Sequence, residues 1–519
     1  MMVLSLLAAE KGETIMLISW SPSLFFLLFL LILSMLLLKN KKKSGRMGFK
    51  LPPSPPKLPI IGNLHQMGNL PHQSLQNLSK KHGPILLLQL GSIKALVVSS
   101  AEAARDVLKT HDLDCCTRPP SPGPKRLSYN HLDIAFGPYG DHWKKMRALF
   151  ISELVSMKRV KSFAYAREAE VDKLINTLSQ NSHTPVNLNE KLYGLADGVI
   201  GTVAFGKIYG TNQFKSEEFH YLLDEAMEMF AGFAAEDFFP SVGRLVDVLT
   251  GLKARREKSF RELDAFFESV VEQHLDPTRP KPEHENLADV LINLLKKQSA
   301  SFSFTKDHVK AILLDTFLGG INTSSVTILW AMSELIKNPR AMKKVQIEIR
   351  SSVGKKGKVE AEDVAKLKYL KMVVKETFRL HPPAPLLVPR EAMHQCRIGG
   401  FDVFPKTRIF VNVWAIGRDP NSWENPNEFY PERFEDNDID FKGSNYELLP
   451  FGAGRRICPA LAMGITNVEF ALANLLYCFD WELPGGMRRE DISMEEEGGL
   501  VCHRKTPLVL APIRYCLQD

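Results

Sequence analysis

The chain has 519 residues, of which 45% are hydrophobic and 24% are charged. This composition supports a large buried core and excludes an intrinsically disordered protein. The formal net charge is +7, and residues 39–50 alone carry six positive charges and no acid. The rest of the chain is therefore close to neutral, which excludes the basic folded face typical of nucleic-acid-binding proteins.

Cysteine usage indicates a reducing compartment for most of the chain. The seven cysteines are few, odd in number and without C-x-x-C spacing, so a disulfide framework is not expected. No glycine/serine linker, internal repeat or low-complexity tract divides the sequence. We therefore expect one large domain behind a short N-terminal appendage, rather than the roughly three domains that length alone suggests.

The first predicted element is an apolar helix near the N-terminus. No charged residue lies between Glu13 and Lys39, and residues 15–38 exceed the roughly 20 apolar residues that span a bilayer. A cleaved signal peptide is the alternative, but its apolar region covers only about 7 to 15 residues and a small-residue cleavage site follows it. Lysines follow here, so we expect a luminal segment at residues 1–13 and a retained, single transmembrane signal-anchor at 14–38. Met16 is an alternative start.

Residues 39–60 combine a basic stop with a proline-rich hinge. Basic residues that flank a transmembrane helix remain in the cytosol. The lysines therefore place the following domain, residues 61–519, in the cytosol. Five prolines in residues 51–59 make a stiff spacer that would hold this domain at a set tilt. An SH3-type ligand and an inert linker are the alternatives.

Helical periodicity dominates the predicted domain. The amphipathic stretches are residues 160–178, 217–230, 257–275, 305–337 and 361–380. Strand-like runs are short and comprise residues 85–90, 95–98 and 407–413. We therefore expect a mainly α fold with small β-sheets.

Trp143 and Arg147 are spaced i, i+4, which places them on one helix face. Lys144 and Lys145 lie between them and point elsewhere. These two lysines are either a solvated surface or a docking patch for an acidic electron donor, and the pattern leaves both interpretations open.

The helix predicted at 305–337, with Thr305 as its N-cap, contains an unfavourable segment at residues 318–325. Gly319 and Gly320 each cost a helix interior about 1 kcal/mol, and Asn322 and Thr323 compete for backbone hydrogen bonds. Such clustering in a core helix indicates a functional site. Close packing of a neighbouring element against the glycines is the alternative.

Glu376 and Arg379 are spaced i, i+3 on the helix predicted at 361–380, and Arg433 follows in the run Phe-Tyr-Pro-Glu-Arg-Phe. By itself the Glu–Arg pair would be an ordinary surface ion pair of little energetic value.

The most informative segment surrounds Cys458. Gly452 and Gly454 permit a tight loop with positive φ. The apolar repeat beyond Pro459 predicts a helix with Pro459 at its first position and Cys458 as its N-cap. There the helix dipole and two adjacent arginines would stabilise a thiolate, which is a good axial ligand for haem iron. A buried structural cysteine is the alternative.

The segment Phe-Gly-Ala-Gly-Arg-Arg-Ile-Cys-Pro-Ala resembles the haem-ligand signature of the cytochrome P-450 superfamily, F-x-x-G-x-R-x-C-x-G, with Ala460 in place of the last glycine. The upstream patterns match further family motifs in the family's order: W-x-x-x-R, the [A/G]-G-x-[D/E]-T-[T/S] groove with Asn322 in place of the acid, E-x-x-R and P-E-R-F. From the anchor to about Pro512 the chain is similar to plant microsomal members of the seventy-one clan.

The resemblance implies the family's fold, a helical haem domain behind one N-terminal transmembrane helix. It assigns Cys458 as the iron ligand, with Phe451 and Gly454 of the same loop as further haem-binding residues. It assigns haem binding to Trp143, Arg147, Arg456 and Arg390. It places Thr323 and Asn322 in the oxygen groove, with Thr323 and ordered water as the expected proton route, and Glu376, Arg379 and Arg433 in a structural network.

The resemblance also implies a monooxygenase at the endoplasmic reticulum membrane, with haem b, O₂ and electrons from NADPH through cytochrome P-450 reductase. Cytochrome b5 is a further candidate donor. The expected substrate is a small hydrophobic plant metabolite: a terpenoid, phenylpropanoid, alkaloid or amino-acid-derived oxime. Substrate contacts are expected within residues 118–133, 206–246, 317–323, 384–388 and 498–501, with an aromatic roof from Phe230, Phe233, Phe238 and Phe239.

Two other classes of function remain open on the sequence. A haem-thiolate isomerase or dehydratase would need neither O₂ nor a reductase, and Asn322 in place of the acid favours it. A membrane-tethered haem sensor would be non-catalytic, but a passive haem holder has no need of the threonine-bearing groove.

Overall fold

The computed structural model describes residues 48–206, 209, 216–297 and 303–515. Within this part the polypeptide forms one compact unit that begins at Lys50. The expected luminal segment and transmembrane signal-anchor lie outside the described residues. Two described helices, Lys306–Lys337 and Leu461–Cys478, are long and apolar enough to cross a membrane, but both are mostly buried in the core.

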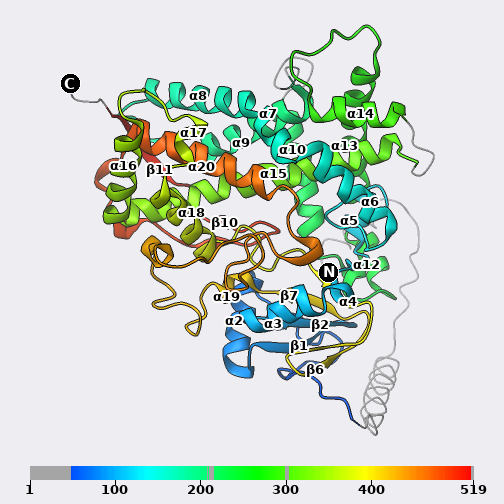
Figure 1. Ribbon diagram of the computed structural model, residues 1–519. Helices are drawn as coiled ribbons and strands as arrows, with labels where there is room; N and C mark the ends of the chain where they lie inside the picture. Colours follow the sequence, from blue (N-terminus) through cyan, green and yellow to red (C-terminus); the bar gives the residue numbers. More distant parts are fainter. Residues whose placement is uncertain (1–47, 207–208, 210–215, 298–302, 516–519) are drawn as a thin grey trace, which may run out of the picture. The chain divides into compact units, whose positions relative to one another are not determined.

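The unit is mainly helical, as predicted (Figure 1). Its helices are α2 (Pro71–His82), α3 (Ala101–Arg105), α4 (Asp112–Cys115), α5 (Pro122–Leu127), α6 (Asp141–Leu149), α7 (Met157–Ser162), α8 (Ala164–Gln180), α9 (Leu188–Phe205), α10 (Ser216–Ala231), α11 (Ala235–Phe238), α12 (Gly243–Leu249), α13 (Leu252–Leu275), α14 (Leu287–Lys297), α15 (Lys306–Lys337), α16 (Pro339–Val353), α17 (Ala361–Val364), α18 (Lys368–Leu380), α19 (Val413–Ile416) and α20 (Leu461–Cys478).

Among the described residues, the strands are short and form four small sheets. They are β1 (Ile85–Leu90), β2 (Ile93–Val98), β3 (Val186–Asn187), β4 (Arg390–Glu391), β5 (Cys396–Ile398), β6 (Phe401–Val403), β7 (Arg408–Val411), β8 (Phe479–Glu482), β9 (Glu496–Glu497), β10 (His503–Arg504) and β11 (Val509–Arg514). The largest sheet has the order β1-β2-β7-β4, with β2 and β7 parallel and the other pairs antiparallel. The other sheets have the orders β3-β11-β8, β5-β6 and β9-β10.

Helix α15 is the central element of the core. It packs against α9, α13, α18 and α20, and most of its side chains are buried. Thr305 is its N-cap, as predicted, and the Thr305 backbone N–H donates to Nδ1 of His308 at 3.1 Å. In Figure 1 the long helices lie together above the sheet formed by β1, β2 and β7. A helix this long and this apolar is stable because packing surrounds it.

Two predicted helices are divided in the structure. The stretch 160–178 is split between α7 and α8 at Phe163, and the stretch 361–380 is split between α17 and α18 by residues 365–367. In both cases the apolar side chains on each side of the break are buried, Phe163 and Leu367 included. Tertiary packing therefore overrides a periodicity that continues through the break.

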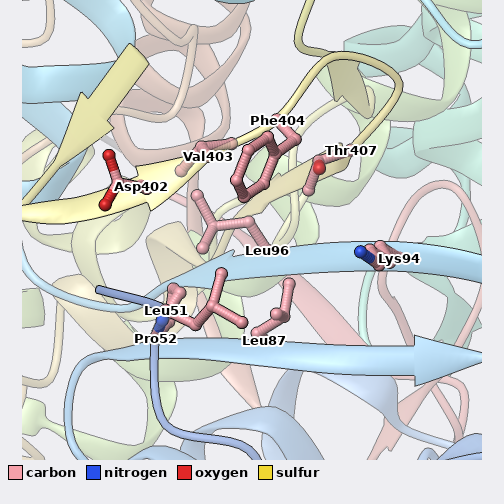
Figure 2. A pocket seen from close by; sticks show the side chains of 9 residues that line it. All are labelled: Leu51, Pro52, Leu87, Lys94, Leu96, Asp402, Val403, Phe404 and Thr407. Atoms are coloured by element: carbon pink, nitrogen blue, oxygen red, sulfur yellow. The ribbon is translucent and has the colours of Figure 1, made fainter. Parts of the chain in front are cut away.

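The compact unit begins at Lys50, eleven residues before the predicted boundary at residue 61. The Lys50 backbone N–H donates to Asp402 at 2.8 Å, and Leu87 N donates to Pro53 O at 2.8 Å. Figure 2 shows Leu51 and Pro52 beside Leu87 and Leu96 in a small pocket. The second half of the predicted hinge is thus part of the folded body, because its carbonyl groups and apolar side chains find partners on β1 and β2.

Candidate active site

Cys458 lies at the end of a tight loop that starts at Phe451. The two loop glycines have φ of 68° and 67°, and a Cβ on Gly454 would meet the Leu108 carbonyl oxygen at 2.3 Å. The Cys458 N–H donates to Phe451 O at 2.9 Å, which closes the loop. At position 454 only glycine can adopt the positive φ and also avoid a clash with the Leu108 carbonyl oxygen.

The predicted position of Cys458 relative to the following helix is wrong by two residues. Helix α20 begins at Leu461, and its N-cap is Ala460 rather than Cys458. Pro459 therefore lies in the turn before the helix and not at its first position. The Ala460 backbone N–H instead donates to the Cys458 sulfur, so one free amide at the helix start still faces the thiol.

Burial raises the pKa of the Cys458 thiol, while the Ala460 N–H and the Arg147 guanidinium act in the opposite direction. The Arg147 Nη2 atom donates to the carbonyl oxygen of Ile457 at 2.6 Å, directly before the cysteine. Because burial dominates, the loop alone favours the thiol. A metal cation at Sγ would reverse this balance, since a coordinated thiol loses its proton.

Two buried arginines, Arg118 and Arg456, and the half-buried Arg147 lie near this loop. Arg456 donates to the carbonyl oxygens of Cys116 at 2.7 Å and Gly137 at 2.7 Å, and Arg118 likewise donates only to carbonyls. Among the described residues, no ion pair includes any of these three arginines. Burial lowers the pKa of Arg456 to about 9 and holds that of Arg118 well below its usual range.

Arginines held away from water without a carboxylate are costly, so they indicate an anionic ligand. Two carboxylates, as on the propionates of haem, would compensate them. Trp143 supports the group, because its indole N–H donates to Ile134 O at 2.9 Å and the Arg456 guanidinium lies 3.9 Å above its ring. The residues present therefore fit a haem.

Arg390 differs from these three arginines. Its Nη1 atom donates to Asp112 at 2.6 Å and its Nη2 atom to Ala453 O at 2.8 Å, both within the core. Asp112 also accepts from the backbone N–H of Arg455 at 2.9 Å. The charge of Arg390 is thus already compensated, and the pair ties α4 to the cysteine loop. Its contact with a propionate stays a prediction.

The predicted groove lies in the middle of α15. Gly319 is exposed although the helix around it is buried, and a Cβ at Gly319 would meet nothing within 4 Å. A Cβ at Gly320 would instead meet Ile200 at 2.7 Å. The first glycine therefore borders open space, and the second permits close packing of α9. The alternative interpretation, close packing, applies to Gly320, and a functional role for the segment around Gly319 stays a prediction.

Thr323 lies one turn after Gly319 on the same face. Its hydroxyl donates to Gly319 O at 2.6 Å. The hydroxyl oxygen can therefore still accept a hydrogen bond from a water or ligand in the open space beside Gly319. Asn322 is buried and lies about 100° further back around the helix. The structure thus brings Thr323, rather than Asn322, to the open face.

Comparison with known proteins agrees with this arrangement. The family model described as Cytochrome P450 matches residues 52–511, which is most of the chain. The chain belongs to the cytochrome P450 family. It is 57% identical to 4-hydroxyphenylacetaldehyde oxime monooxygenase of Sorghum bicolor over 96% of both chains. It is 52% identical to 2-methylbutanal oxime monooxygenase of Manihot esculenta, over 95% of this chain and 97% of the relative.

Further relatives include Cytochrome P450 71B37 of Arabidopsis thaliana, 52% identical over 94% of this chain and 98% of the relative. Among solved structures, a zebra fish cytochrome P450 with progesterone aligns with a TM-score of 0.75 and 25% identity, covering 85% of this chain and 99% of that one. The predicted fold and the predicted enzyme class, a plant cytochrome P450 monooxygenase of the seventy-one clan, are confirmed. Haem with a cysteine thiolate, and O₂, follow from the family.

In this cytochrome P450, Glu376 joins Arg379 and Arg433. Its carboxylate accepts from Arg379 Nε and Nη2 at 2.7 Å each and from Arg433 Nε at 2.9 Å. Both Glu376 and the Arg379 side chain are fully buried, unlike the surface pair that spacing alone suggests. Phe378, on the same helix, packs edge-on against Phe451 of the cysteine loop at 5.2 Å. The network thus lies one side chain away from that loop.

The phenylalanines of the predicted aromatic roof differ in their surroundings, and their contact with a substrate stays a prediction. Phe230 of α10 stacks on Phe136 at 4.9 Å, whereas Phe233 is 59% exposed and stacks on Phe238. In the sequence, Arg118 stands out only as the start of a substrate segment. Sequence patterns do not indicate Asp112, Asp133 or Asp315, since isolated aspartates in a chain this charged carry no distinguishing local pattern.

A second group of possible metal ligands lies elsewhere. His72, Glu496 and Cys502 place ligand atoms within 4.8 Å of one another. The Glu496 oxygens already accept from His72 at 2.8 Å, Gln73 at 2.7 Å and Trp414 at 2.9 Å. Protein donors therefore satisfy this carboxylate without an ion.

Proposed function

We propose that this cytochrome P450 oxidises a small hydrophobic aldoxime of the kind derived from an amino acid. The observation that carries the proposal is the activity for which two relatives are named: both are oxime monooxygenases, at 57% and 52% identity over nearly the whole chain. One acts on an aromatic oxime and the other on a branched aliphatic oxime. Their shared feature is the oxime group, so the oxime is the part of the substrate that we transfer to this chain.

In this proposal Cys458 would bind the haem iron, and Arg147, Arg456 and Trp143 would hold the haem propionates, with Arg390 as a further candidate. The haem, when bound, supplies the activation of O₂. The chain itself supplies the position of the substrate and the path of protons. The Thr323 hydroxyl donates to Gly319 O. In the proposed path it accepts a proton from ordered water and passes its own proton to a group in the open space beside Gly319.

Electrons come from NADPH through cytochrome P450 reductase, with cytochrome b5 as a further candidate donor. The proposed location is the endoplasmic reticulum membrane, with one transmembrane helix at residues 14–38 and the domain in the cytosol. The apolar run and the lysines that follow it support this placement.

The test uses the full chain reconstituted with a plant reductase. We expect a strongly red-shifted Soret band in the reduced carbon monoxide complex, absent in Cys458→Ala. We then expect NADPH- and O₂-dependent consumption of 4-hydroxyphenylacetaldehyde oxime or 2-methylbutanal oxime, with monoterpene alcohols as negative controls. Turnover of the controls but of neither oxime would contradict the assigned substrate class.

A second candidate function is reductase-independent dehydration, in which an aldoxime R–CH=N–OH loses water to give the nitrile R–C≡N. Asn322, which replaces the groove acid by an amide, favours it because no carboxylate stands at that position to relay protons. The same assay separates the two: nitrile formed at an equal rate without NADPH and O₂ would favour dehydration.

A further inference from the structure

Cys115 and Cys396 form a pair of buried thiols that the haem site does not use. Their sulfur atoms are 3.7 Å apart and share a hydrogen bond. Cys115 ends α4 and Cys396 begins β5, so 281 positions separate the two in the chain. Among the six described cysteines, no other pair has its sulfur atoms in hydrogen-bonding contact.

The main chains around the two cysteines are joined directly. The Met393 N–H donates to Asp114 O at 2.7 Å, and the Glu391 N–H donates to Thr117 O at 2.9 Å. These bonds hold the residues on both sides of Cys115 against the segment that leads into β5. A disulfide has its sulfur atoms about 2.0 Å apart, so an approach of about 1.7 Å from the observed distance would join the pair.

The two thiols differ in access and in acidity. Cys115 is completely covered, whereas Cys396 keeps 7% of its surface exposed. The hydrogen bond between the thiols lowers the pKa of Cys396, whereas that bond and burial raise the pKa of Cys115. Because the thiolate is the reactive form, Cys396 is the thiol that an oxidant meets first. Cys115 is then the neighbouring thiol that can resolve the oxidised product.

Simple packing is the alternative interpretation, because a free cysteine often behaves as a small buried hydrophobe. Both side chains belong to a core cluster that also contains Val107, Leu108 and Ala453. A cysteine that only packs is inert toward oxidants. Reactivity with a small oxidant therefore separates the two interpretations.

We propose that Cys115 and Cys396 are a modification site, a dithiol that hydrogen peroxide oxidises to a disulfide joining α4 to β5. In the first step the Cys396 thiolate attacks peroxide, the O–O bond breaks, and a sulfenic acid and hydroxide form. In the second step the Cys115 sulfur displaces the sulfenic oxygen, so that the S–S bond forms and water leaves.

The overall reaction is balanced and reversible. Hydroxide from the first step takes up the proton that the Cys396 thiol lost, so two thiols and one peroxide give one disulfide and two waters. A dithiol reductant restores both thiols by exchange through a mixed disulfide. Transient disulfides of this kind are the ones expected in a reducing compartment.

The cross-link would act on the cysteine loop through α4. Asp112 of α4 accepts from Arg390 Nη1 at 2.6 Å and from the Arg455 backbone N–H at 2.9 Å. A disulfide at Cys115 would therefore fasten to β5 the helix that already holds this loop. We expect the oxidised protein to lose haem more slowly than the reduced protein.

The test uses the full-length, haem-loaded protein in lipid nanodiscs. The haem iron is blocked with 4-phenylimidazole, whose binding shifts the Soret band, so that the haem does not consume the oxidant. After treatment with hydrogen peroxide, mass spectrometry of non-reduced peptides should show the Cys115 and Cys396 peptides joined, and dithiothreitol should separate them. We expect the cross-link to slow thermal loss of haem about tenfold, a modest effect for a cross-link between distant residues.

Serine variants identify the two sulfurs. Cys115→Ser and Cys396→Ser should each abolish both the cross-link and the slower loss of haem. The matched control is Cys116→Ser, because the Cys116 sulfur instead donates to Leu113 O at 3.7 Å. This control should retain the cross-link. The peptide map of the native protein decides the central claim even if a serine variant does not load haem.

Three outcomes would overturn the proposal. The first is recovery of both cysteines as free thiols after peroxide treatment. The second is Cys396 recovered as a sulfinic acid with no cross-linked peptide, which would show that Cys115 does not resolve the sulfenic acid. The third is a cross-link that leaves the rate of haem loss unchanged, which would remove its role in fastening α4. None of these measurements depends on an oxime substrate.

Discussion

Removal of the Glu376 carboxylate should destabilise the fold strongly. Glu376→Ala deletes two bonds from Arg379, one from Arg433 and one from the Tyr430 backbone N–H at 2.8 Å. The Arg379 side chain is completely covered, so its charge would remain buried without a counter-ion. Breaking a buried pair from one side costs about 3–5 kcal/mol, and we expect a loss of this size.

The loss should extend to the cysteine loop. Arg379 also donates to Gly417 O and Pro426 O at 2.6 Å each, and Phe378 of the same helix packs on Phe451. Loosening α18 therefore loosens one wall of the loop that carries Cys458. We expect a lower haem content in Glu376→Ala, in addition to the lower stability.

The assay is urea unfolding of the solubilised full chain, followed by far-ultraviolet circular dichroism, with haem content measured on the same samples. The control is Asp141→Asn, which breaks an i, i+3 pair with Lys144 at 3.0 Å on the surface, and should leave the unfolding midpoint unchanged. A Glu376→Ala protein with native stability and full haem content would refute the reasoning, because it would show that the covered guanidinium finds a replacement partner at no cost.

Three further predictions follow from the site and from α20. Gly319→Ala should fold normally but weaken 4-phenylimidazole binding, because its methyl group enters open space, whereas Gly320→Ala should lower the melting temperature, because its methyl group meets Ile200 at 2.7 Å; the reverse pattern would contradict the assigned faces. Thr323→Val should keep the carbon monoxide spectrum but yield less product per NADPH consumed, as measured by parallel NADPH and product assays, and undiminished coupling would remove Thr323 from the proton route. Burial raises the pKa of Glu469 to about 7, so the folded state binds its proton more tightly than the unfolded state does. This penalty on stability is absent below about pH 4 and grows as the pH rises to about 7, to at most about 3 kcal/mol. Glu469→Gln should therefore stabilise the protein at pH 8 and not at pH 4, as measured by urea unfolding, and equal effects at both values would contradict the shift.

The local sequence alone determined the class of this protein and the positions of its main elements. The spacing of glycines before Cys458 requires a tight loop, and the structure shows positive φ at both. The long apolar helix at residues 306–337, the strands β1, β2 and β7, and the pattern Trp143–Arg147 were also predictable, because periodicity and steric limits act over a few residues.

Only the tertiary structure decided which charged groups are compensated. Arg390 and Arg456 look equivalent as sequence, but Asp112, far away in the chain, neutralises the first and leaves the second with carbonyl partners. The partners of Asp315 were also decided only by the tertiary structure, because the two backbone amides that donate to it lie about 180 residues earlier in the chain. The start of α20 and the breaks at Phe163 and Leu367 were likewise set by packing. Long-range burial, and the desolvation that accompanies it, depends on neighbours that no local pattern specifies.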